Sequence, residues 1–168
     1  MSYEKGFDLL IRAHAKVLKK GIDHNLIIVG NGPHQGELQE LVRCLEVTDS
    51  VFMAGYVENP YPLIKKASAL VLPSRFEGLS GVVIEALTLA KPVVATACGG
   101  HVEILSDGRN GILVPPEDVE SLADGMSRIL SDGYLREKFS IPDIEHLRCF
   151  STEYIVPQWE QLLMEVVR

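Results

Sequence analysis

Two carboxylates, Glu77 and Glu85, stand eight residues apart across a loop that contains Gly78 and Gly81. Residues 81–91 contain two charged side chains, Glu85 and Lys91, and Lys91 ends the run. A carboxylate in apolar surroundings needs hydrogen-bond partners, because an unpaired buried charge is very costly. A glycine-containing loop that leads into a helix offers free backbone N–H groups and the positive end of the helix dipole to an anion. These residues therefore suit a ligand that combines phosphate with hydroxyl groups.

The elements that must position this loop can be predicted from the apolar pattern. Short apolar runs predict strands at residues 26–29, 51–54, 69–72, 93–95 and 112–114. Apolar residues at helical spacing predict helices at residues 7–18, 37–45, 61–67, 81–90, 101–105, 119–130, 134–140 and 152–167. Strands that alternate with helices form parallel βαβ units. We therefore predict an α/β fold, a Rossmann-like doubly wound parallel sheet with helices on both faces, whose ligands bind beyond the carboxyl ends of the strands.

Composition excludes several classes of function. The 168 residues are 46% hydrophobic and carry a formal net charge of −7. This balance predicts a packed domain and argues against nucleic acid or an anionic membrane as the main partner. The three cysteines are far apart and include no Cys-x-x-Cys, so a disulfide framework or a structural zinc site is not expected, and a reducing, cytoplasmic setting fits best. No apolar run approaches the roughly 18 residues of a membrane span.

Four further residues carry expectations of their own. His14 lies on an apolar helix face and is expected to be a hydrogen-bonded core residue. Arg75 is expected at the surface or on the rim of the site, and His101 on the rim. The single tryptophan, Trp159, is expected to pack the last helix against the domain.

Several stretches together resemble one known family. They are EKGFDLLIRA, VGNGP, the Glu-x7-Glu pair of Glu77 and Glu85, KPVVA, Gly99-Gly100, Glu103-Ile104 and NGILV. In this order and spacing they are similar to the C-terminal half of the group-1 glycosyltransferases, which have the GT-B fold and retain the anomeric configuration. The similarity runs from about Glu4 to the end of the chain.

The resemblance implies a site for a nucleotide-diphosphate sugar. Lys5 would pair with the diphosphate, and the two catalytic carboxylates would accept hydrogen bonds, Glu77 from the sugar hydroxyls and Glu85 from the ribose. The other donor-binding positions that it implies are Gly30, Gly32, Val57, Gly78, Leu79, Ser80 and Gly81. Among these, the amides of the last three would line the sugar and phosphate, and the backbone around Val57 and the Gly30–Gly32 turn would border the base.

The resemblance also implies chemistry without a metal or other cofactor. The chain contains no Asp-x-Asp, the motif through which metal-dependent sugar transferases hold the diphosphate with a carboxylate-bound cation. Cationic side chains and helix ends would instead neutralise the leaving group. The implied reaction transfers a hexose-type sugar to a glycan or lipid-linked acceptor in polysaccharide biosynthesis.

The family pattern also differs from this chain at the N-terminus. The family carries an Arg five residues before the Lys, on a central strand, and that position falls before Met1. We therefore expect residues 1–150 to be the nucleotide-sugar-binding domain, without the first strand. Residues 151–168 would form a helix, kinked at Pro157, that crosses toward a missing N-terminal acceptor domain. Such a chain would be inactive alone and prone to associate through unpaired strand edges. The missing domain would also provide any attachment to the inner face of the membrane.

Three alternative functions remain open. The same fold could serve a nucleotide-sugar epimerase or a non-catalytic nucleotide-binding module. Gly30-x-Gly32-x-x-x-Gly36 is a near match to the dinucleotide-binding fingerprint of oxidoreductases. Pro33 and the extra residue weaken that match, and the next strand ends Met53-Ala54-Gly55, without the acidic residue expected there.

Overall fold

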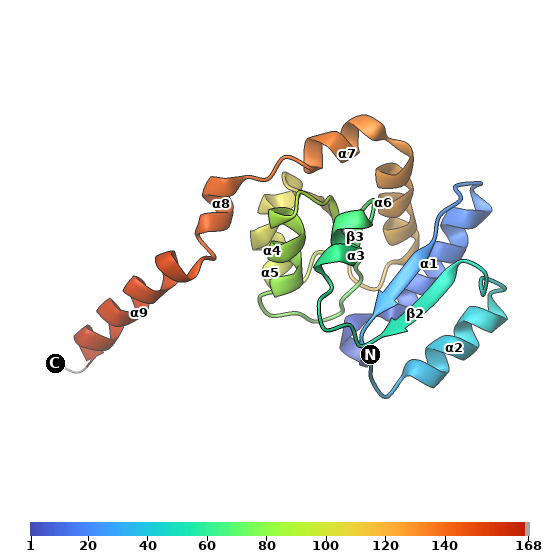
Figure 1. Cartoon of the computed structure of the whole chain (residues 1–168), viewed down its shortest axis with the longest axis horizontal. Coiled ribbons are helices and arrows are strands. Elements are labelled where there is room, and N and C mark those ends of the chain that lie inside the picture. The colour runs from blue at the N-terminus through green and yellow to red at the C-terminus, as the bar shows by residue number, and fades with distance from the viewer. Residues whose placement is uncertain (167–168) are drawn as a thin grey trace.

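The computed structural model describes residues 1–166, apart from the side chain of Asp107, and has the predicted α/β architecture (Figure 1). Its strands are β1 (Leu26–Val29), β2 (Val51–Gly55), β3 (Leu70–Leu72), β4 (Val93–Thr96) and β5 (Ile112–Val114). Its helices are α1 (Phe7–Lys19), α2 (Gln35–Cys44), α3 (Tyr61–Lys66), α4 (Gly81–Thr88), α5 (Gly100–Ile104), α6 (Val119–Ser131), α7 (Gly133–Phe139), α8 (Ile144–Arg148) and α9 (Thr152–Val166), with 3-10 turns η1 (Tyr3–Lys5) and η2 (Ser106–Gly108). All five predicted strands are present, and α8 is the one helix among the described residues that the sequence did not predict.

The strands are parallel but form two sheets. β1 pairs with β2, and β3, β4 and β5 pair in that order. Among the described residues no strand lies hydrogen-bonded between β1 and β3, so the doubly wound sheet is divided at that point. The carboxyl ends of parallel strands still lie on one side, as the predicted site requires.

Helices cover both faces of the three-stranded sheet. Along β4 the side chains alternate, so that Val94 joins a core with α1 and α6 while Val93 and Ala95 join a second core with α4 and α5. These three of the four β4 residues are fully buried. Strands covered on both faces are apolar throughout, which explains why this run showed no alternation of apolar and polar residues.

One face of the β1–β2 sheet remains open to solvent. The cross-strand neighbours Ile27 and Phe52 are 51% and 49% exposed, whereas Leu26 and Ile28 point into the core. Because successive strand residues point to opposite faces, the open side is the one away from α1 and α2.

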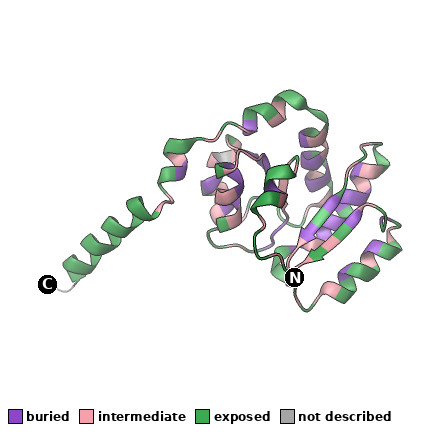
Figure 2. Ribbon diagram, viewed as in Figure 1, coloured by how far each residue is buried: buried purple, intermediate pink, exposed green. Residues whose placement is uncertain are grey.

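The last helix, α9, extends away from the body and all its described residues are exposed (Figures 1 and 2). Its large apolar side chains are Tyr154, Ile155, Val156, Trp159, Leu162, Leu163, Met164 and Val166. The prediction that Trp159 packs against the domain is wrong, since this side chain is 60% exposed. An apolar stripe shows that a helix has a face to cover, but not which surface covers it. Residues 167 and 168 of the predicted helical segment lie outside the described residues.

The described helices are also too short or too polar to cross a membrane. None of those in residues 1–166 combines the length and the hydropathy that a bilayer span requires.

Candidate functional site

The first residues of the chain connect two loops at the carboxyl ends of the strands. The amino group of Met1 donates to the carbonyl of Asn31, in the turn after β1. The carbonyl of Glu4 accepts a hydrogen bond of 2.7 Å from the amide of Arg75, in the loop after β3. In Figure 1 the N-terminus accordingly lies beside the ends of β1 and β2. The N-terminal segment thus forms part of the rim at which the sequence placed the site.

Two of the predicted site residues meet directly on this rim. Lys5 Nζ lies 2.7 Å from Glu77 Oε2, and the hydroxyl of Ser74 donates to the same oxygen at 3.3 Å. The Glu77 side chain is 14% exposed, and that of Lys5 is 45% exposed. A lysine ammonium carries three donors and a carboxylate has about four acceptor positions, so each group retains capacity for a ligand.

The loop that carries Glu77 rests on a turn that only glycine can form. The amide of Gly100 donates to the carbonyl of Gly78 at 2.8 Å. Gly99 has a φ of 48°, and a Cβ at this position would collide with the carbonyl of Glu77. The Gly99-Gly100 pair therefore allows the backbone of the Glu77 loop to approach the end of β4.

Helix α4 starts where this loop ends. Its N-cap residue, Ser80, is buried with an extended backbone, and its carbonyl accepts from the amide of Val83 at 3.1 Å. The amides of the first helical residues, including Gly81, have no partner one turn earlier in the helix. With the helix dipole, they make this end of α4 suitable for an anion.

The burial of Glu85 differs from the prediction. The side chain is half-buried rather than buried, because α4 also exposes Gly81 and Thr88 and is not enclosed on all sides. Within residues 1–166 the Glu85 carboxylate makes no hydrogen bond or ion pair to another residue. Its position four residues after Gly81 places it one turn into the helix.

The positions predicted to border the base belong to the β1–β2 half of the rim. Gly30 has a φ of 121° and donates its amide to the carbonyl of Gly55 at 2.7 Å, which joins the two strand ends. A Cβ at Gly32 would collide with Met1, so this glycine is required for the position of the N-terminus. Val57, in the loop after β2, is half-buried.

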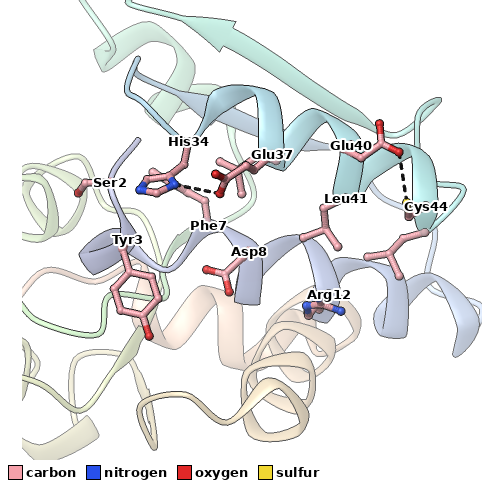
Figure 3. Close-up of a pocket in the computed structure, with 12 residues that line it drawn as sticks. Ser2, Tyr3, Phe7, Asp8, Arg12, His34, Glu37, Glu40, Leu41 and Cys44 are labelled. Carbon is pink, nitrogen blue, oxygen red and sulfur yellow. Dashed lines mark hydrogen bonds and ion pairs between the residues drawn. The ribbon is translucent and has the colours of Figure 1, made fainter.

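A separate hollow of about 610 Å³ lies between α1 and α2 (Figure 3). Its walls include Phe7 and Leu41, but Lys5, Glu77 and Glu85 do not line it. Two of its carboxylates already have partners, since Glu37 pairs with His34 at 2.9 Å and Glu40 accepts from Cys44 at 3.5 Å. The hollow is therefore separate from the predicted site residues on the rim.

Two residues that the sequence placed at the surface or rim are buried. Arg75 is 9% exposed and forms ion pairs with Asp8 and Glu117. The hydrogen bond to Asp8 is the largest cause that raises the pKa of Arg75 above its ordinary value, and it holds the pKa of Asp8 below its own. His101 is fully buried, with its Nδ1 3.0 Å from the carbonyl of Thr96. The burial of Arg75 has no signal in the local sequence, because its partners Asp8 and Glu117 are distant in the chain.

Metal ligands do not gather in the part of the chain that the structure describes. No three His, Cys, Asp or Glu side chains among those residues lie close enough together to hold a metal ion.

The family described as "Glycosyl transferases group 1" matches residues 1–132, which hold the whole rim. The chain belongs to the group 1 glycosyltransferases. This glycosyltransferase chain is 34% identical over 139 residues to the alpha-D-kanosaminyltransferase of Streptomyces kanamyceticus, a match that covers 82% of the chain and 36% of the relative. It spans less than half the length of the curated relatives it matches.

Solved structures of glycosyltransferases share the fold. TarM of S. aureus superposes with a TM-score of 0.89 and 27% identity over 96% of this glycosyltransferase chain and 33% of TarM. The C-terminal domain of a group 1 glycosyl transferase (LpcC) from Francisella tularensis gives a TM-score of 0.77 and 24% identity over 92% of the chain and 83% of that domain. These matches confirm the predicted GT-B, Rossmann-like fold.

Proposed function

We propose that residues 1–150 form the donor-binding domain of a glycosyltransferase that retains the anomeric configuration and needs no metal. The donor is a nucleotide-diphosphate sugar, and the transferred sugar is of the hexose type. The acceptor is a glycan or a lipid-linked glycan. The observation that carries the proposal is the 2.7 Å pair of Lys5 and Glu77 on the rim, beside the loop that leads into α4. The TarM structure, which contains UDP, supports a nucleotide as the ligand class.

In the proposed complex the cations and helix end of the rim receive the diphosphate. Lys5 keeps one donor on Glu77 and offers the other two to phosphate oxygens. The first amides of α4 face the same group, with Gly81 at the start of the helix. Both stabilise the negative charge that develops on the diphosphate as it leaves, which is the usual role of preorganised donors in group transfer.

The two carboxylates hold the hydroxyl groups of the donor. Glu77, with one oxygen committed to Lys5 and Ser74, accepts from the transferred sugar through its other oxygen. Glu85, half-buried and without a partner among residues 1–166, accepts from the ribose. The ribose thereby satisfies a carboxylate that the protein leaves unpaired.

Calorimetric titration tests the binding. The uridine, guanosine and adenosine diphosphates should be titrated against the wild-type chain, with and without a chelator, and one of them should bind equally in both conditions. Lys5→Met and Glu85→Gln should each weaken this binding by about tenfold or more, because charge-assisted hydrogen bonds contribute about 1.5–3 kcal/mol. Glu120→Gln, which removes an exposed carboxylate that pairs with Lys16 on the outside of α6, is the matched control and should bind as wild type.

Two outcomes would overturn the proposal in different ways. A folded wild-type chain that binds none of the three diphosphates would overturn donor binding. Binding that disappears with the chelator and returns with magnesium would overturn only the metal-independent part. Analysis of the product's anomeric configuration, made with a protein of the full length of the relatives, tests retention and separates a transferase from an epimerase, which needs no acceptor.

A further inference from the structure

Arg75 is the most extensively bonded side chain beside the proposed donor site, and nothing in the proposed reaction uses it. The side chain is 7% exposed, although the next residue in the loop after β3, Phe76, is 71% exposed. Burial of an arginine is tolerated only when its donors are paired. Its partners therefore show what its position stabilises.

The guanidinium holds the N-terminal segment on both sides of Lys5. It donates two parallel hydrogen bonds of 2.8 Å to the carboxylate of Asp8, three residues after Lys5. It donates a third, of 2.9 Å, to the carbonyl of Tyr3, two residues before Lys5, and lies 4.0 Å from the centre of the Tyr3 ring. Lys5 is thus in the middle of a short segment whose two ends are bonded to one planar group.

The backbone of Arg75 also contacts the N-terminal segment, close to Glu77. The amide of Arg75 donates to the carbonyl of Glu4 at 2.7 Å, and two residues later Glu77 Oε2 receives Lys5 Nζ at 2.7 Å. The Arg75 Nε also donates to Glu117 at 3.1 Å, which joins the loop before α6 to the same group. The Lys5–Glu77 pair therefore lies at the end of an assembly that Arg75 holds together.

We propose that Arg75 is a positioning residue that presets Lys5 and Glu77 for the diphosphate of the donor. This inference rests on the proposed donor-binding function. Arg75 itself does not touch the ligand. Only a guanidinium can make the planar set of bonds to Asp8, Tyr3 and Glu117, so lysine cannot replace it. A ligand that binds a preset site does not have to order it, which favours affinity.

The test compares a nucleoside diphosphate with its monophosphate. The diphosphate that binds wild type best is titrated with its monophosphate against wild type, Arg75→Lys and Arg75→Met. Both variants should lose about tenfold or more in affinity for the diphosphate and less than about threefold for the monophosphate, because Lys5 is misplaced while the base contacts near Gly30 remain. Arg136→Met is the matched control: Arg136 also donates to backbone, the carbonyls of Ile129 and Leu130, but lies far along the chain on α7. It should leave the ratio of the two affinities unchanged.

A second measurement keeps the inference testable if the Arg75 variants unfold. Asp8→Asn keeps the guanidinium but weakens its bidentate partner, and it should reduce the same affinity ratio to a smaller extent. In a Lys5→Met background, Asp8→Asn or Arg75→Lys should have no further effect on the ratio, because the contribution of Arg75 passes through Lys5. Equal losses for both ligands, or an unchanged ratio in every folded variant, would overturn the positioning role and leave donor binding intact. A wild-type chain that binds no nucleotide diphosphate would overturn donor binding, and this inference with it.

Discussion

Acidification from pH 7 to pH 5 should lower the free energy of unfolding by about 2 kcal/mol through one residue, His14. This side chain is fully buried on α1. Its Nδ1 lies 2.8 Å from His24 Nε2 and its Nε2 lies 2.8 Å from the hydroxyl of Ser50. His24 Nδ1 lies 2.9 Å from the carbonyl of Ile22, which can only accept, so that nitrogen carries the hydrogen. Neutral rings in these tautomers give all four ring nitrogens a partner, with His24 accepting from His14 and His14 accepting from Ser50.

The magnitude follows from the pKa of His14. Burial, and secondarily the neighbouring His24, lower this pKa from 6.5 to about 4. A histidine whose pKa is depressed in the folded state is protonated first in the unfolded chain. Its contribution to stability is therefore complete above pH 6.5 and is lost as the pH falls toward 4. The difference in protonation free energy is small at pH 7, about 2 kcal/mol at pH 5 and about 3 kcal/mol below pH 4.

Urea unfolding at the two pH values, followed by far-ultraviolet circular dichroism, measures this difference. Fluorescence would report on the wrong part of the chain, because the single tryptophan, Trp159, is exposed on α9. His14→Leu should be less stable than wild type at pH 7 by about 1–3 kcal/mol, since Ser50 and His24 lose a partner, but its stability should fall less on acidification. The reasoning would be refuted if wild type and His14→Leu lost the same stability between pH 7 and pH 5.

The remaining predictions concern packing. Gly99→Ala should destabilise the chain by about 1–3 kcal/mol, because the new Cβ collides with the carbonyl of Glu77 and the φ of 48° is strained for alanine. Thermal unfolding measures the loss of stability. A variant as stable as wild type would contradict the close approach of Gly99 to Glu77. Leu122→Ala should cost about 2–5 kcal/mol, because this α6 side chain is 1% exposed. Leu162→Ala, on α9 with 50% exposure, should change the free energy of unfolding by less than about 0.5 kcal/mol, and a large loss would show that α9 is covered in solution.

Much of the fold could be predicted because its strands are short apolar runs between turn residues. The runs at β1 and β5 have the predicted boundaries, and β4 extends the prediction by Thr96. The apolar patterns alone predicted neither the division of the sheet nor the exposure of α9; the division agrees with the family resemblance, which led us to expect a domain without a central strand. A periodic apolar face indicates that a surface should be covered, but it does not identify the covering element.

The candidate site was predictable where adjacent residues carry the signal. Glu77, the glycines and the start of α4 occur in one stretch, and their motif indicated an anion site before any distance was known. The burial of Arg75 depends on Asp8, 67 residues away in the chain, and on Glu117, 42 residues away. Pairing over such separations is set by the tertiary fold, so local sequence could not show it. The predicted roles of Glu77, Glu85 and Lys5 stay predictions until the binding of a nucleoside diphosphate is measured.

The division between β1 and β3 affects how the molecule would respond to a ligand. No strand hydrogen bonds join the two sheets in residues 1–166, so the halves are connected by side-chain packing and by the N-terminal segment. Gly30 belongs to one half of the rim and Glu77 to the other. A donor that contacts both halves would hold the two sheets together where they are least connected. Amide hydrogen exchange in both sheets should then slow when the nucleotide is added.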